Sequence, residues 1–263
     1  MSTFKGTSLP ISQSGLNQVS SLLGVTAAEI WTVLAVETHG FGFLADRRPA
    51  ILFERHIFHK QTGGRFDANP AISSPETGGY LGGAKEYDRL AQAIALDRHA
   101  ALNSASWGIG QVMGFNSAAA GFPTVEAMVE AMVQSEDQQL EGMAKFVRSK
   151  GLHTPLASHN WAEFAKGYNG ESFAKNQYDQ RLAASFLALS TGPLPDVRVR
   201  QAQALLTFLG NDVGGIDGVN GKRTRSAVVS FRQAAGQGNS ETIDDALISA
   251  LLAKLSAATS VSA

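Results

Sequence analysis

The sequence predicts a mainly α-helical protein: a large helical domain that includes a small extended element, followed by a small, mainly helical domain. Apolar residues recur at helical spacing along much of the chain, whereas only residues 50–54 have the character of a strand. No region alternates strands and helices as a parallel α/β sheet requires. A stretch with two prolines and a glycine at residues 190–196 predicts a linker between domains at 1–189 and 197–263.

The first two predicted helices lie at residues 16–23 and 26–40, and the second carries signals at both ends. Thr26 and Glu29 are spaced as a capping box at its start, and Gly40 suits the position just past its last turn. We therefore expect this helix to end shortly before Gly40.

Glu37 lies on the apolar stripe of this second helix. It follows Ile30, Val33 and Leu34 at the i+7 position, so we expect its carboxylate against apolar neighbours. Burial there would raise its pKa and retain the proton near neutral pH, as a general acid requires. The alternative is a glutamate at the edge of the stripe that reaches water or pairs with an arginine.

The middle of the chain combines one extended segment with a long loop. Residues 50–54 follow a proline and read as a short strand, and residues 61–83 are rich in Gly, Pro, Ser and Asn. Such a loop in a compact domain is usually functional or mobile. Further helices are expected at residues 87–102, 124–150, 161–166 and 172–188, the second of them continuous or broken.

Glu54 ends the extended segment and is a second candidate for acid–base chemistry. Under strict strand alternation it shares a face with Leu52 and is expected to point inward. Two inward carboxylates are the minimum equipment for glycoside hydrolysis. The alternative is a structural interaction of Glu54 with the adjacent Arg55 or His56.

Two more segments carry side chains that suit a sugar. Residues 104–114 combine three glycines with Trp107 and Gln111, and a tryptophan face can pack on the apolar side of a sugar ring. Tyr168 and Asn169 offer a phenol and an amide at a turn, both suited to sugar hydroxyls. The alternatives are a core tryptophan in a glycine-rich turn and a structural tyrosine.

The composition argues against several other kinds of site. The chain has no cysteine, which excludes disulfides, zinc–thiolate sites and a cysteine nucleophile, and its net charge of -1 gives no basic field for nucleic acid. His56 and His59 lack the HExxH pattern, so we expect no metal site. The glycine-rich residues 214–224 lack the spacing of a phosphate loop, and no cofactor is expected.

The N-terminus carries no apolar segment of signal-peptide type, and no apolar run approaches transmembrane length. We therefore expect synthesis in the cytoplasm and no membrane insertion. A target outside the membrane would require release by another factor.

Four motifs in order resemble the N-acetylmuramidase domain of phage endolysins, whose wider relatives are goose-type lysozymes and soluble lytic transglycosylases. They lie at residues 35–38, 48–58, 105–114 and 168–170, within a resemblance that covers about residues 10–190. The resemblance implies a lysozyme-like α+β catalytic domain with a small extended element beside its cleft.

The same resemblance implies roles for individual residues. Glu37 matches the catalytic acid of the family, and Glu54 matches a second acidic residue close to the cleft. Gln111, Tyr168 and Asn169 match positions that line the cleft.

The C-terminal domain resembles the three-helix peptidoglycan-binding domain. The pattern DGxxGxxTxxAVxxF is intact at residues 217–231, within a resemblance that begins at Val199. Asp217 and Gly218 are expected to form a tight turn, and Thr224 to cap the helix that follows. A weak wall-binding domain of this kind raises the effective concentration of a catalytic domain on an insoluble polymer.

Together the two resemblances imply an endolysin that hydrolyses the β-1,4 bond between N-acetylmuramic acid and N-acetylglucosamine. Its expected partner is the glycan strand of peptidoglycan, and it is expected to act as a monomer in the periplasm or cell wall. Glu54 would activate water in an inverting reaction or act as nucleophile in a retaining one. A lytic transglycosylase that forms anhydromuramic products, and a non-catalytic wall-binding protein, stay open as alternatives.

Overall fold

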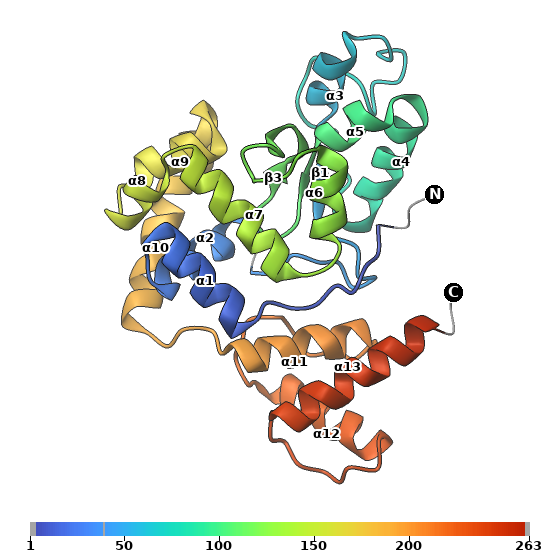
Figure 1. The fold of residues 1–263 in the computed structure, drawn as a ribbon, viewed down its shortest axis with the longest axis vertical. Coiled ribbons are helices and arrows are strands. Elements are labelled where there is room, and N and C mark those ends of the chain that lie inside the picture. The colour runs from blue at the N-terminus through green and yellow to red at the C-terminus, as the bar shows by residue number, and fades with distance from the viewer. Residues whose placement is uncertain (1–3, 39, 261–263) are drawn as a thin grey trace.

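The computed structural model describes residues 4–38 and 40–260. It is mainly helical with one small sheet, which confirms the predicted fold class, and Figure 1 shows a larger unit above a smaller, all-helical unit. The helices of the larger unit are α1 (Gln13–Leu23), α2 (Ala27–Thr38), α3 (Arg55–Thr62), α4 (Glu86–Leu96), α5 (Arg98–Asn103), α6 (Val125–Met132), α7 (Glu136–Ser149), α8 (His153–Ala157), α9 (Trp161–Asn169) and α10 (Tyr178–Thr191), with short 3-10 helices η1 (Gly83–Lys85), η2 (Gly114–Asn116) and η3 (Glu171–Asn176). The smaller unit contains α11 (Val197–Phe208), α12 (Lys222–Ala234) and α13 (Asp245–Ser260).

The predicted extended element is the first strand of a three-stranded antiparallel sheet. β1 (Ile51–Phe53) pairs with β2 (Ala105–Trp107), and β2 pairs with β3 (Val112–Met113). Ile51 and Phe53 of β1 are buried, whereas Leu52 between them is only half-buried. In Figure 1 the sheet lies between one group of helices, α1, α2 and α8–α10, and another, α3–α5.

The predicted capping of α2 is present in a modified form. The backbone amide and hydroxyl of Thr26 both donate to the Glu29 carboxylate, at 3.0 and 2.5 Å, and the Thr26 hydroxyl accepts from the Ala28 amide at 3.2 Å. Gly40 follows the helix with φ of +82°, a conformation that glycine adopts at little cost. The helix therefore starts and stops where its local residues indicate.

Two predicted helical stretches are divided by residues that cap the next helix. Residues 87–102 break at Asp97, whose carboxylate accepts from the Ala100 amide at 3.0 Å and starts α5. Residues 124–150 break before Ser135, whose hydroxyl accepts from the Gln138 amide at 3.1 Å and starts α7. The expected helix at 172–188 begins later, because η3 occupies Glu171–Asn176.

The apolar residues form two separate clusters. The first fills the larger unit, and its largest fully buried members include Phe53, Phe58, Trp107 and Phe164. The second lies among α11, α12, α13 and the loop after α11, and it contains Leu205, Val213, Val228, Leu247 and Leu251. Each unit thus has a core of its own.

The two units nevertheless contact each other directly. Residues 192–196 connect them, and the Asp196 carboxylate then accepts from the amides of Arg198 and Val199, at 2.9 and 3.0 Å, to start α11. Gln201 of α11 donates to the Ile11 carbonyl at 3.0 Å. The ring of Phe208 lies 5.9 Å from that of Phe41 in the larger unit.

Within the described part of the chain, no single helix has the length and hydropathy to cross a membrane. The helices α1 and α2 pass that test only as a pair, and they meet at a bend of 103°.

Candidate active site

Glu37 lies in the last turn of α2 as a partly exposed residue whose carboxyl group is surrounded by protein. The Asn169 side chain donates from Nδ2 to Glu37 Oε1 at 3.0 Å. Burial raises the pKa of Glu37 above its ordinary value, and the Asn169 hydrogen bond and the positive charge of Arg181 offset only part of that effect. The predicted burial of this carboxyl group is therefore present, together with a polar partner.

Tyr168 and Asn169 are the last residues of α9, and they connect Glu37 to the turn after β2. The Tyr168 hydroxyl donates to the Gly110 carbonyl at 2.5 Å, while its ring lies against those of Phe146 and Phe164. Burial, and next the negative charge of Glu37, raise the pKa of Tyr168 well above its usual range. The phenol is therefore a neutral donor that fixes the turn.

Asn169 has one further property that bears on ligand binding. Its Oδ1 atom is buried and accepts no hydrogen bond from the described residues. A buried amide oxygen is ordinarily paired, so this atom is a ready acceptor for an N–H or O–H group next to Glu37.

Two residues of α10, Tyr178 and Arg181, lie close to Glu37, and neither is predictable from the sequence alone. Arg181 donates to the Val36 carbonyl at 3.0 Å, and its guanidinium lies 5.3 Å from the centre of the Tyr178 ring. Burial and the charge of Glu37 raise the pKa of Tyr178. A tyrosine and an arginine three residues apart are common on any helix, so only the packing of α10 on α2 reveals their place.

Glu54 is partly buried, with 16% of its side chain exposed, and lies outside the apolar core. It shares its face with Leu52, as expected, but this is the half-buried face of β1, and the core face is formed by Ile51 and Phe53. Glu54 lies just before α3, with its carboxylate 3.2 Å from His56 Nδ1. The interaction with His56 that was the structural alternative is therefore present.

Arg55 makes no ion pair with Glu54 and instead bonds the backbone of the neighbouring loop. Its guanidinium donates to the carbonyls of Pro70, Glu76 and Thr77, each at 3.0 Å. These bonds fix the start of the glycine-rich segment that follows, residues 78–83.

Tyr80 in this segment is a site residue that the sequence reasoning missed. Its hydroxyl donates to both carboxylate oxygens of Glu54, at 2.9 and 3.1 Å, although the residue is 46% exposed. Tyr80 stands between the pairs Gly78–Gly79 and Gly82–Gly83, all at positive φ. A single aromatic residue framed by two glycine pairs is the signal that could have indicated it.

The buried Glu86 anchors the far end of this glycine-rich segment. Its carboxylate accepts from the amides of Leu81 and Gly82, at 2.5 and 2.9 Å, and pairs with Arg89 at 2.7 Å. Tyr80 is thus presented on a loop that is fixed at both ends.

Trp107 does not face a ligand, so its predicted role in sugar binding is wrong. The residue is fully buried, and its indole Nε1 donates to the Leu102 carbonyl at 3.1 Å. As a residue of β2 opposite Ile51, it turns its ring into the core. Glycines and a tryptophan in a short segment do not distinguish a ligand face from a core face.

Gln111 holds the turn between β2 and β3 together. It adopts φ of +47°, its Nε2 donates to the Gly108 carbonyl at 2.8 Å and the Ala50 carbonyl at 3.2 Å, and Ser106 donates to its Oε1 at 2.7 Å. Gln111 follows Gly110, whose carbonyl accepts from Tyr168, and it is therefore close to the residues around Glu37. Direct contact of Gln111 with a substrate stays a prediction.

The predicted residues thus fall into two groups. Glu37, Tyr168 and Asn169 meet at the ends of α2 and α9 and reach the turn that Gln111 braces. Glu54 lies between β1 and α3, in contact with His56 and Tyr80. Over residues 4–38 and 40–260, no group of three or more His, Asp or Glu side chains is arranged to hold a metal ion.

In the smaller unit the expected turn is present and the expected cap is not. The Asp217 carboxylate accepts from the Val219 amide at 2.9 Å, and Gly218 has φ of +74°. Thr224 is buried inside α12, whose N-cap is Gly221, so the prediction that Thr224 caps this helix is wrong.

The three motif residues of this unit instead share one buried partner. Gln203 Nε2 donates to Asp217 at 2.9 Å and to the Thr224 hydroxyl at 3.1 Å, and its Oε1 accepts from the Gly218 amide at 2.8 Å. Thr224 and Gly218 are buried and hold the unit together, and only Asp217 is exposed.

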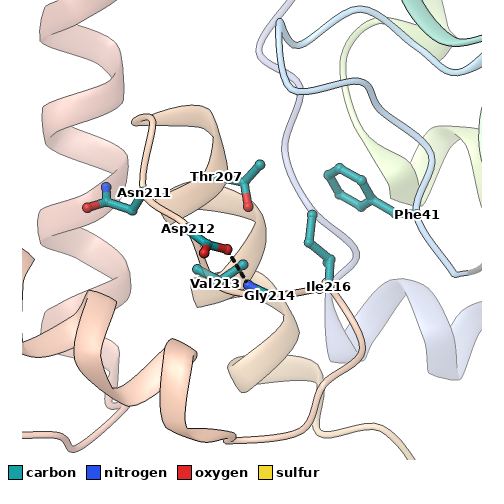
Figure 2. A pocket seen from close by; sticks show the side chains of 8 residues that line it. Phe41, Thr207, Asn211, Asp212, Val213, Gly214 and Ile216 are labelled. Atoms are coloured by element: carbon teal, nitrogen blue, oxygen red, sulfur yellow. Dashed lines mark hydrogen bonds between the residues drawn. The ribbon is translucent and has the colours of Figure 1, made fainter.

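An open pocket of roughly 340 Å³ lies where the two units meet (Figure 2). Phe41 of the larger unit faces Ile216 of the smaller one across it, and the Asp212 carboxylate accepts from the Gly214 amide at 2.9 Å. Thr207, Asn211, Val213 and Gly215 complete the lining.

Comparison with known proteins agrees with this architecture. Residues 26–190 match the N-acetylmuramidase family, and residues 195–238 match the putative peptidoglycan binding domain. The crystal structure of Burkholderia AP3 phage endolysin is 41% identical, with a TM-score of 0.63 over 69% of this chain and 71% of that one. No curated protein gives a significant match. The chain therefore belongs to the N-acetylmuramidase family and is a peptidoglycan hydrolase of the muramidase type.

Proposed function

We propose that Glu37 is the general acid that protonates the glycosidic oxygen when the β-1,4 bond between N-acetylmuramic acid and N-acetylglucosamine breaks. The observation that carries this proposal is a carboxyl group whose pKa is raised by burial and whose Oε1 accepts a hydrogen bond from Asn169. A raised pKa keeps the acid protonated at higher pH, which matches the task of donating a proton.

Asn169 and Tyr168 position this acid. The Asn169 amide fixes one carboxyl oxygen, which leaves Oε2 to face the leaving group. Its unpaired Oδ1 accepts an N–H or O–H group of the sugar beside the bond that breaks. Tyr168 ties α9 to Gly110, so the turn that contains Gln111 forms the adjoining wall.

Glu54 is the partner that activates water, and Tyr80 positions it. The phenol donates to both Glu54 oxygens, which holds the carboxylate in one orientation. Because Tyr80 is half exposed on an anchored loop, its ring also offers an apolar face to the glycan.

The alternative reaction needs only the acid. The contacts of Glu37 and of Glu54 are made with different partners, Asn169 for the first and Tyr80 and His56 for the second. A site that uses Glu37 alone would let the 6-hydroxyl of the substrate attack, as in lytic transglycosylases, and would release anhydromuramic products.

The domain arrangement fits action on an insoluble polymer. We assign residues 1–191 to catalysis, 192–196 to the linker and 197–263 to wall binding; the linker starts later than the predicted residue 190 because α10 continues to Thr191. We further propose a monomer, made in the host cytoplasm, that reaches peptidoglycan in the periplasm or wall after release by another factor. Glycan strands are the only partner this proposal requires, without nucleic acid or membrane insertion.

The test is lysis of permeabilised cells by the wild type, Glu37→Gln and the matched control Glu130→Gln, which changes an exposed glutamate on α6. Loss of general acid catalysis is expected to lower the rate of Glu37→Gln by about 10²–10⁴-fold. The control is expected to clear cells as the wild type does. Equal clearing by Glu37→Gln would refute the assignment of Glu37 as the acid.

A further inference from the structure

Arg200 of the smaller unit is buried inside the larger one. Only 1% of the residue is exposed, and its guanidinium pairs with both oxygens of Glu136, at 2.5 and 2.8 Å. Glu136 is the first residue of α7 and is fully buried. This bidentate, charge-assisted pair links the two units directly.

The Glu136 carboxylate accepts hydrogen bonds from three separate segments of the chain. Besides Arg200, its Oε2 accepts from the Ile11 amide at 2.8 Å, and its Oε1 accepts from the Gly42 amide at 2.8 Å. Both oxygens are therefore satisfied, and the segments before α1 and after α2 are held to the same carboxylate.

Arg200 also reaches the end of the helix that carries Glu37. Its Nε donates to the Gly40 carbonyl at 3.0 Å, and its Nη2 donates to the same oxygen. Gly40 lies three residues beyond Glu37. The guanidinium lies 5.6 Å from the Trp31 ring of α2 and 5.5 Å from the Phe41 ring.

These contacts are all made with the larger unit, although the smaller unit has a core of its own. Stabilising α11 does not explain them, since α11 is already started by Asp196 and packed on α13. A guanidinium that bonds the carbonyl just past α2 fixes where that helix ends, and hence where Glu37 stands.

We infer that Arg200 is a positioning residue for the muramidase reaction, through which the smaller unit holds the C-terminal end of the Glu37 helix in place. This inference rests on the proposed role of Glu37. The smaller unit thereby contributes to catalysis as well as to wall binding.

The experiment separates catalysis from wall binding in the full-length protein. Turnover is measured on soluble, peptide-free glycan strands, where attachment to the wall brings no advantage, and binding to intact sacculi is measured separately. Arg200→Met is compared with Arg198→Met, the same change at an exposed arginine that pairs with Asp245 inside the smaller unit. Arg200→Lys keeps the charge next to Glu136 but lacks the planar fork that also reaches Gly40.

The expected result is a fall of kcat on soluble strands by about 10²-fold in Arg200→Met, the scale of a small misplacement of a catalytic group. A smaller fall is expected in Arg200→Lys and none in Arg198→Met. The alkaline limb of the kcat/KM profile should move to lower pH in Arg200→Met, because water that enters beside Glu37 reduces the burial that raises its pKa. Sacculus binding should be unchanged in all variants.

The double variant Arg200→Met/Glu136→Gln separates loss of positioning from loss of stability. It removes the charge that Arg200→Met leaves unpaired but does not restore the bond to Gly40. A low kcat with a shifted pH profile in this variant supports positioning, and recovery of wild-type turnover would overturn it. If Arg200→Met keeps the wild-type kcat while Glu37→Gln is inactive, the positioning role of Arg200 is refuted and the role of Glu37 as acid stands. If Glu37→Gln is active, the proposed acid is refuted.

Discussion

The pair between Arg200 and Glu136 makes a quantitative prediction about stability. Both side chains are almost completely buried, at 1% and 0% exposure, so Arg200→Met leaves a charge in the core without its partner. Breaking a buried pair in this way costs about 3–5 kcal/mol. For a chain of this size 1 kcal/mol corresponds to about 2–4 °C in Tm, so the midpoint should fall by roughly 6–20 °C.

The assay is thermal unfolding followed by calorimetry and by tryptophan fluorescence, since Trp31 lies beside the guanidinium. The double variant Arg200→Met/Glu136→Gln should regain a large part of the lost stability, because no charge is then stranded. Arg198→Met should unfold as the wild type does, since its partner lies at the surface. A Tm for Arg200→Met within a degree or two of the wild type would show that the buried pair contributes little to stability.

Three further predictions concern Tyr80, Glu37 and Trp107. Burial and the Glu54 carboxylate raise the pKa of Tyr80 to about 12, so Glu54→Gln should bring its ultraviolet titration to lower pH; an unchanged titration would show that the two do not interact. The pKa of Glu37 is raised in the folded state, so the folded protein binds more protons above the unfolded value of 4.5 and stability falls as pH rises. Glu37→Gln should therefore unfold at higher denaturant concentration than the wild type at neutral pH, with the gain vanishing near pH 4, and a gain equal at both pH values would contradict this. Trp107→Ala should cost about 3–5 kcal/mol of stability as a core truncation, and an increase in KM with no loss of stability would restore its role in sugar binding.

Local features of the fold were predictable because neighbouring residues determine them. The start of α2 follows from Thr26 and Glu29, three residues apart, and its end follows from Gly40. The single strand of residues 50–54 follows from its composition, and β1 occupies Ile51–Phe53. Glu37 was placed correctly on the stripe of its helix because the helical period alone decides that.

The features that sequence reasoning missed depend on contacts between distant residues. Tyr80 reaches Glu54 from 26 residues away, and Arg200 reaches Glu136 from 64 residues away. The burial of Trp107 is a second case, because its ring turns inward through pairing of β2 with β1, and composition does not encode that pairing. Thr224 was assigned as a cap because its hydroxyl suits that role, whereas Gln203 of another helix uses it.

The most direct test of the central claim is mass spectrometry of the products released from purified peptidoglycan in ¹⁸O-labelled water. Hydrolysis assisted by Glu37 predicts muropeptides with a reducing N-acetylmuramic acid that has gained one labelled oxygen, and no such products from Glu37→Gln. Unlabelled anhydromuramic products from the wild type would contradict hydrolysis and would leave Glu54 without a role in activating water.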